Sequence, residues 1–185
     1  MHIGYVYGDV RAPKDASVYI PRFIPGIRLP HAWVSPKLPK APKYSASIYT
    51  TVLAPALDTS YIKEFTSADA ELRQWSTLDL CARDAFTFFV GSPAQHVFIE
   101  KVGDYLASFP YKTTVPFRTI TISEDLEAMS DTKKGREWLS GSGINKGGVL
   151  LVRPDQHILA VVPEGTTASA EEVAETLASH LGFNV

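Results

Sequence analysis

Cysteine is almost absent from this sequence, because Cys81 is the only one among 185 residues. A single cysteine excludes an internal disulfide, a dithiol pair and a zinc site built from cysteines. Long apolar runs are missing as well, and the first residues, Met1 to Tyr5, lack the basic and apolar regions of a signal peptide. These absences predict a cytoplasmic protein that does not contact a membrane.

An excess of charge of one sign is also lacking. The chain carries 18 Lys and Arg against 20 Asp and Glu, a formal net charge of -2. Such a balance produces no strong field that would attract nucleic acid or an anionic membrane surface. We therefore expect no nucleic-acid partner. The length and the hydrophobic fraction of 45% are sufficient for one well-filled core.

Two common signatures of catalytic sites are missing from the sequence. Gly-x-Ser-x-Gly, the usual sign of a serine hydrolase, does not occur. None of the histidines pairs with another at a spacing typical of metal ligands. We therefore expect neither that hydrolase chemistry nor a bound metal.

Proline is abundant where regular structure should be scarce. Residues 1–44 contain seven prolines, and Pro36, Pro39 and Pro42 alternate with lysines, which favours extended, solvent-facing chain. Residues 45–75 hold only one short β-like run, 48–53. We expect residues 1–75 to form an N-terminal extension and an inserted segment packed on a domain made by residues 76–185.

From residue 76 onward the pattern predicts an ordered series of elements. A short aromatic run ends at Gly91, and Ser92 with Pro93 then begins a helix whose apolar positions recur on one face. Ser169 and Glu172 form a capping box that announces the last helix. The expected elements are a strand at 85–90, a helix with Phe98, Val102, Tyr105, Leu106 and Phe109 on one face, a strand at 115–122, a helix at 132–139 followed by a loop at 140–143, strands at 148–152 and 158–162 joined by a turn at Pro154, and a helix from 169 to 182.

This order of elements is that of the thioredoxin fold, an α/β fold in which a βαβ unit joins a ββα unit around one mixed sheet. In redox-active thioredoxins the helix after the first strand opens on two cysteines, where the helix N-terminus stabilises a thiolate. Here that turn reads Ser92-Pro93-Ala94-Gln95-His96. We therefore predict a thioredoxin-like domain without thiol redox chemistry.

Several segments, taken together and in order, resemble the C-terminal region of the FAD-dependent aromatic hydroxylases, the phenol hydroxylase family. They are residues 3–7, Pro25 to Trp33, Ser76 to Leu80, Phe86 to Phe89 and Gly148 to Asp155 with His157. The resemblance implies a redox-inactive thioredoxin-like dimerisation domain that follows the flavin and substrate domains. The glycine-rich turn that would hold FAD is absent, so we expect no cofactor in this chain.

The sequence departs from this family at two places. Residues 35–74 form a long stretch where relatives pass more directly to the Ser-Thr-Leu-Asp motif, and Gln156 stands where such a hairpin often has glycine. Gln156 implies either a different turn or a left-handed backbone at some energetic cost.

The candidate proton carriers are His31 and His96, because histidine titrates near neutral pH. His31 lies between Pro30 and Trp33, where a packing and hydrogen-bonding role is the alternative. His96 lies near the amide-rich start of a helix that could hold an oxyanion, and its alternative is an exposed first-turn position. The candidate substrate-binding residues are Arg28, Trp33, Tyr49, Tyr61 and Trp75. The aromatic members could line a pocket for a flat phenolic ligand, and their alternative is a place in the core or at an interface.

Two functions from different classes follow from the sequence. The first is a flavin-free protein that acts on an aromatic or polyketide intermediate by acid-base steps such as isomerisation, cyclisation or elimination. The second is a non-catalytic module that forms a homodimer or pairs with a separate FAD-dependent hydroxylase. A chain excised from a longer oxygenase is a third possibility.

Overall fold

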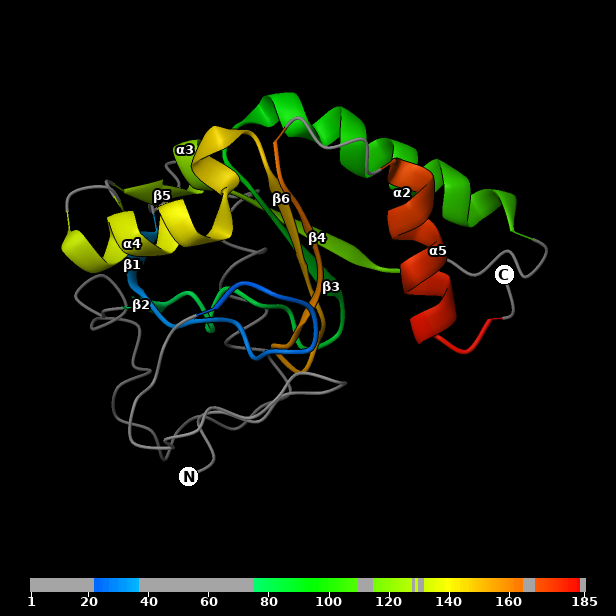
Figure 1. Ribbon diagram of the computed structural model, residues 1–185, viewed down its shortest axis with the longest axis horizontal. Helices are drawn as coiled ribbons and strands as arrows, with labels where there is room; N and C mark the ends of the chain where they lie inside the picture. The colour runs from blue at the N-terminus through cyan, green and yellow to red at the C-terminus, as the bar shows by residue number, and fades with distance from the viewer. Residues whose placement is uncertain are drawn as a thin grey trace, which may run out of the picture.

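A computed structural model describes residues 22–36, 75–109, 115–127, 129, 132–164 and 169–183 (Figure 1). Tyr49, Tyr61 and the β-like run 48–53 lie outside the described residues, as do Pro39 and Pro42. The predicted roles of these residues therefore stay predictions.

A mixed four-stranded sheet in the order β4-β3-β6-β7 forms the centre of the molecule. Strand β3 (Phe86–Val90) is buried along its whole length and pairs in parallel with β4 (Phe117–Thr121). On its other side β3 pairs antiparallel with β6 (Val149–Val152), which pairs antiparallel with β7 (Ile158–Val162). A central strand that is apolar at every position needs cover on both faces, because its side chains alternate between them.

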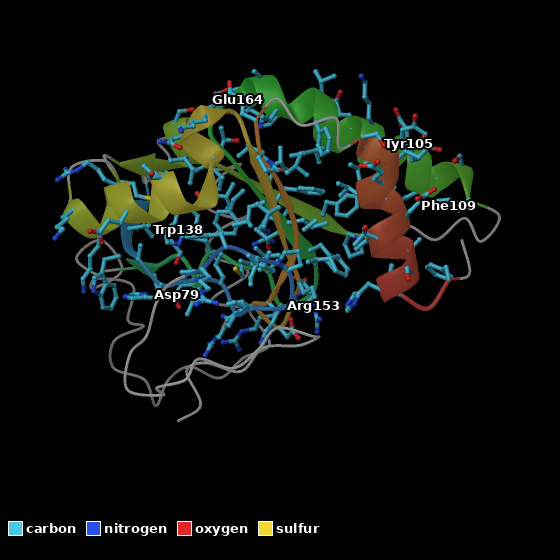
Figure 2. All side chains as sticks on the ribbon, in the orientation of Figure 1. Asp79, Tyr105, Phe109, Trp138, Arg153 and Glu164 are labelled. Carbon is cyan, nitrogen blue, oxygen red and sulfur yellow. The ribbon has the colours of Figure 1, made fainter. Side chains whose placement is uncertain are left out.

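Helices supply this cover on both faces of the sheet (Figure 1). Helix α2 (His96–Ser108), which follows the 3-10 turn η2 (Pro93–Gln95), packs with α5 (Ala170–His180) on one face around Phe88 and Leu151. Helix α4 (Lys133–Ser142) covers the other face, where Trp138 contacts Phe89 (Figure 2). This arrangement confirms the predicted thioredoxin-like α/β fold.

Residues 22–34 pack on the face covered by α4. Leu29 and Ala32 are buried there, and Gly26 and Ile27 exchange backbone hydrogen bonds with Ile158 of β7. The chain then forms a small second sheet of order β2-β1-β5, from β1 (Trp33–Pro36), β2 (Trp75–Ser76) and β5 (Leu126–Glu127). Two short helical turns complete the described elements, α3 (Ile122–Asp125) and η4 (Ile144–Lys146).

Three details of the sequence prediction were wrong. The strand expected at 115–122 covers only Phe117–Thr121, and Ile122 begins α3 instead. Residues 140–142 belong to α4 rather than to a loop, and the helix ends at Gly143, whose φ of 72° needs the left-handed region that glycine adopts easily. Tyr105 was placed on the buried face of α2 but is 39% exposed, because the buried stripe of α2 runs through Ile99, Val102 and Leu106. The capping box of α5 is confirmed, with Ser169 and Glu172 hydrogen-bonded in both directions.

Candidate functional site

The turn after β3 stands where a redox-active thioredoxin carries its cysteines. The backbone N–H of Ser92 donates to Gln95 Oε1 at 2.9 Å, and the Ser92 hydroxyl donates to the same oxygen at 3.0 Å. Pro93 follows, and its missing N–H and fixed φ suit the first position of the helical turn. The turn is thus closed by an amide and a hydroxyl, neither of which can form a disulfide.

Cys81 does not replace the missing cysteines. It precedes β3, whereas the turn follows β3, so the length of the strand separates the two. Its thiol is 3% exposed and donates to the carbonyl of Thr77 at 3.7 Å. Burial raises the pKa of Cys81 strongly, and nearby Asp79 adds to the rise. A buried neutral thiol is a poor nucleophile, so Cys81 is poorly suited to thiol chemistry.

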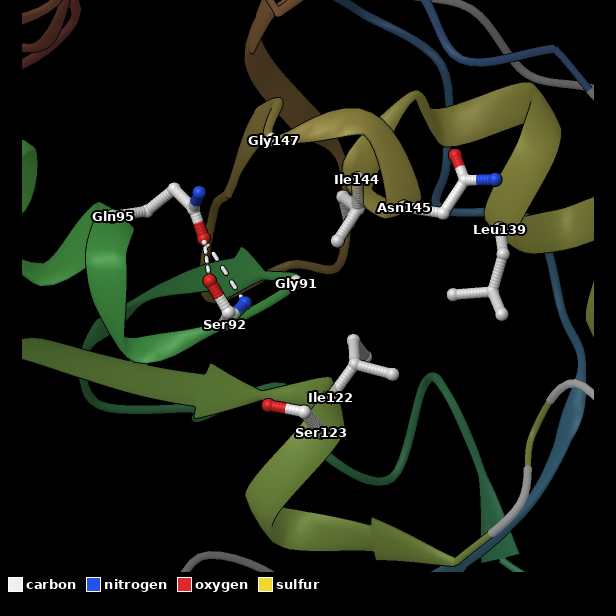
Figure 3. Close-up of a pocket in the computed structure, with 9 residues that line it drawn as sticks. All are labelled: Gly91, Ser92, Gln95, Ile122, Ser123, Leu139, Ile144, Asn145 and Gly147. Carbon is white, nitrogen blue, oxygen red and sulfur yellow. Dashed lines mark hydrogen bonds between the residues drawn. The ribbon is translucent and has the colours of Figure 1, made fainter.

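A cavity of about 260 Å³ opens beside the turn (Figure 3). Residues from the turn after β3, from α3, from α4 and from η4 with its C-cap line it: Gly91, Ser92, Gln95, Ile122, Ser123, Leu139, Ile144, Asn145 and Gly147. One wall is formed by backbone, because a Cβ on Gly91 would lie 2.5 Å from the carbonyl oxygen of Ile144. The carboxyl ends of the parallel strands β3 and β4 both reach this place, which is where open α/β sheets commonly bind ligands.

His96 lies directly after the cavity residue Gln95. Its Nε2 is 2.8 Å from the hydroxyl oxygen of Thr121 at the end of β4. The backbone N–H of Thr121 donates in turn to Oδ2 of the buried Asp125 at 2.7 Å. These contacts hold the imidazole against β4. His96 is therefore a neighbour of the cavity but is not one of the residues that line it.

His31 belongs to a different network, at the second sheet. Its Nδ1 is 2.6 Å from the Ser76 hydroxyl oxygen, which accepts the backbone N–H of Leu78 at 3.1 Å. The Trp33 ring packs edge-on against the imidazole at 4.5 Å between ring centroids, although Trp33 is itself 51% exposed. Burial is the largest cause that lowers the pKa of His31, and Lys134 lowers it further while Asp79 opposes the shift.

Thr77 explains why the motif residues around His31 lie together. Its hydroxyl donates to the carbonyl of Pro30 at 2.9 Å and accepts the N–H of Ala32 at 3.1 Å. The indole N–H of Trp138 donates to the same Pro30 carbonyl at 2.7 Å. These buried contacts hold the segments 29–33 and 76–79 together. They agree with a packing and hydrogen-bonding role for His31.

Arg28 lies at the β6–β7 hairpin, which is at the end of the sheet opposite the cavity. Figure 2 shows the two ends, with Arg153 at the hairpin and Glu164 beyond β7 at the other end. Arg28 Nη2 donates to Gln156 Oε1 at 2.6 Å, and Gln156 Nε2 donates to the carbonyl of Leu78 at 3.1 Å. Gln156 has a φ of 67°, so the left-handed alternative considered for this residue is the one that occurs.

The structure thus brings some of the candidate residues together and leaves others apart. His31, Trp33 and the backbone of Trp75 meet at the second sheet, where Val34 pairs with Trp75. Arg28 joins the hairpin, and His96 joins β4, so within the described ranges no hydrogen bond or ring contact links His96 to His31. Groups of three or more His, Cys, Asp or Glu that could hold a metal are absent from the residues that the structure describes.

Sequence reasoning missed the cavity. Its lining comes from separate segments of the chain, and most of these residues carry no chemical signature of their own. The one available signal was the turn Ser92 to His96, which marks the active-site position of the fold. Within the described residues no helix has the length and apolarity to cross a bilayer.

Comparison with solved structures finds a similar fold within larger flavin-dependent monooxygenases. No protein-family model matches the sequence, and no curated protein matches it. The flavin-dependent monooxygenase PieE, solved with FAD and substrate, superposes with a TM-score of 0.59 at 19% identity, over 98% of this chain and 26% of PieE. Aklavinone-11 hydroxylase, solved with FAD and aklavinone, superposes with a TM-score of 0.51 at 18% identity, over 95% of this chain and 26% of that enzyme.

This chain shares its fold with part of these monooxygenases. It spans only about a quarter of their length, and at such low identity the similarity concerns the fold alone.

Proposed function

We propose that this chain is the thioredoxin-like domain of an FAD-dependent aromatic hydroxylase system and acts there as a non-catalytic assembly module. It would correspond to the C-terminal domain of those enzymes and would form a homodimer or pair with the part that binds flavin and substrate. The observation that carries the proposal is the superposition of 98% of the chain on 26% of a flavin monooxygenase.

The site geometry supports a role without chemistry. The turn after β3 has no cysteine, and the thiol of Cys81 is buried. The motif residues Pro30, His31 and Thr77 use their polar groups to hold one segment of the chain to another. Polar groups that already form hydrogen bonds within the fold are better suited to stabilising the structure than to reacting with a substrate.

A second candidate is cofactor-free acid-base catalysis on an aromatic or polyketide intermediate. The observation that favours it is the position of His96, beside a cavity and next to a residue that lines it. His31 would have to act separately, because it belongs to the network at the second sheet. The two proposals therefore predict different effects of replacing His96 on activity.

The test is co-expression of the tagged chain with FAD-binding polypeptides of the monooxygenase type whose fold it shares in part. Size-exclusion chromatography with light scattering measures the assembly, and oxygen-dependent hydroxylation of a phenolic substrate measures activity. We expect a defined complex, and we expect His96→Gln and His31→Gln chains to sustain hydroxylation as well as the parent chain.

Turnover of a phenolic polyketide by the chain alone, lost in His96→Gln, would establish the second candidate instead. A chain that forms neither a homodimer nor a complex would overturn the assembly proposal.

A further inference from the structure

We propose that the cavity beside the turn after β3 binds a small, uncharged ring compound that carries one hydrogen-bonding oxygen, of the phenol class. This assignment concerns binding in the thioredoxin-like domain itself and does not depend on the proposed assembly role.

The body of such a ligand would meet an apolar surface. Ile122, Leu139 and Ile144 come from three different elements, and their side chains surround the open space in Figure 3. Ile144 is fully buried and Leu139 is 9% exposed, so the surrounding packing holds both side chains in place beside the cavity. Contact with aliphatic walls favours an apolar ring over a strongly hydrated ligand.

The volume fits one substituted ring. The cavity measures about 260 Å³. An engineered apolar cavity of roughly 150 Å³ is known to hold benzene, so the space here can take a ring with one or two further substituents. Compounds with three or four fused rings are too large to enter completely.

Gln95 presents a side-chain donor at the cavity wall for the oxygen of the ligand. Gln95 Oε1 accepts both the N–H and the hydroxyl of Ser92, and an N–H donor fixes which end of the amide faces Ser92. The other end, Nε2, makes no hydrogen bond with the described residues. Gly147 keeps the space beside it open, because even a Cβ there would lie only 3.6 Å from Nε2. An oxygen on the ring would give this donor its partner.

The charges at the site disfavour an anion. None of the nine lining residues has an ionisable side chain, and the carboxylate of Glu164 lies at the edge, with Oε1 3.5 Å from the Cβ position of Gly147. An ionised ligand would therefore lose its hydration without gaining a counter-charge and would face a nearby carboxylate. A neutral hydroxyl avoids both costs.

The test is a titration of the isotope-labelled chain followed by amide NMR signals. The probes are p-cresol, toluene, which lacks the oxygen, and p-toluate, which replaces it by a charge. We expect p-cresol to shift the signals of Gly91, Ser92 and Gly147, toluene to bind about fivefold more weakly, as one neutral hydrogen bond predicts, and p-toluate to cause no shifts there.

Two pairs of variants locate the contacts. Gln95→Leu should abolish the preference for p-cresol over toluene, whereas Ser92→Ala, which keeps Gln95 Nε2, should retain it. Ile122→Phe should fill the space and weaken both ligands at least tenfold, and Val97→Phe, on the exposed side of α2, should change neither. Two results would overturn the assignment: no shift of the Gly91, Ser92 and Gly147 signals on addition of p-cresol, or a preference for p-cresol over toluene that survives in Gln95→Leu.

Discussion

At the scale of single residues, the hydroxyl of Thr77 joins two parts of the chain that are far apart in sequence. It donates to Pro30 and accepts from Ala32, and Thr77 is 0% exposed. In Thr77→Val the shape is kept, but the N–H of Ala32 loses its buried acceptor. We expect a loss of about 1–3 kcal/mol in the free energy of unfolding. Urea denaturation measures it.

Thr176→Val is the matched control for this prediction. Thr176 donates to the carbonyl of Glu172 on the exposed side of α5, so its loss should change the free energy of unfolding by no more than about 0.5 kcal/mol. Equal effects of the two substitutions would show that the hydroxyl of Thr77 is not structural.

The thiol of Cys81 should be chemically silent in the folded protein. Burial raises its pKa, so very little thiolate forms at neutral pH. We expect a disulfide reagent such as dithionitrobenzoate to react with the native chain at least about a hundredfold more slowly than with the chain in denaturant. A Cys81→Ser, Val97→Cys chain supplies the comparison, because position 97 is 57% exposed and its thiol should react at once. Rapid reaction of native Cys81 would contradict its burial.

His31 should make stability depend on pH. Burial lowers its pKa below 6.5 in the folded state, with Lys134 adding to the shift. Between the folded and the unfolded pKa the unfolded chain binds more protons, so the free energy of unfolding rises with pH in this window. The contribution is complete above the unfolded pKa and is lost as the pH falls through the window. NMR titration of the imidazole measures the pKa directly.

His31→Gln tests the same prediction through stability. The pH dependence of unfolding between about pH 5 and 7.5 should become flatter in this variant. His180 also has a lowered pKa, from burial and from Arg153. His180→Gln should therefore remove only the contribution of His180 to the pH dependence of unfolding. An unchanged pH dependence in His31→Gln would contradict a lowered pKa of His31 in the folded state.

At the scale of elements, the sequence predicted the four main strands and three main helices because each carries a strong local signal. The aromatic run before Gly91, the capping box at Ser169 and Pro154 in the hairpin all act within a few residues. The strands β1, β2 and β5 were not anticipated. Each has only two to four residues, too few to show a period, and each forms because tertiary contacts such as those of Thr77 bring it into place.

The candidate site was less predictable for a related reason. His31 and His96 attract attention because histidine has a distinctive chemistry, yet their partners, Ser76 and Thr121, are 45 and 25 residues away along the chain. The cavity depends on where Ile122, Leu139 and Ile144 converge, which the periodicity of one element does not encode. Periodicity assigns a residue to a face, but only packing decides which faces leave a space between them.

The hairpin between β6 and β7 allows a prediction about strain. Gln156 has a φ of 67°, and its side chain makes hydrogen bonds with Arg28 and with the carbonyl of Leu78. Gln156→Ala keeps the strained backbone and loses both contacts, whereas Gln156→Gly loses the contacts but relieves the strain. We expect the glycine variant to be more stable than the alanine variant by about 1–2 kcal/mol in thermal or urea unfolding. Equal stabilities would mean that the turn relaxes in the alanine variant.

At the scale of the whole molecule, one sheet separates two apolar clusters. The cluster under α2 and α5 includes Leu177, and the cluster under α4 includes Trp138 together with Leu29 from the N-terminal part of the chain. Both rest on β3 and β6, whose side chains alternate between them. Loss of either cluster would expose one apolar face of β3 and β6 and so destabilise the strands on which the other cluster rests. The described residues should therefore unfold as one unit.

Leu177→Ala tests this coupling across the sheet. Leu177 is fully buried, and its truncation should lower the free energy of unfolding by about 2–5 kcal/mol. The three tryptophans, Trp33, Trp75 and Trp138, lie in β1, β2 and α4, away from Leu177. Tryptophan fluorescence should therefore shift to the same lower urea midpoint as the circular dichroism signal, although the substitution is on the opposite face. A fluorescence midpoint that stays at the parent value would show that residues 22–36 and α4 form a unit that folds independently of α2 and α5.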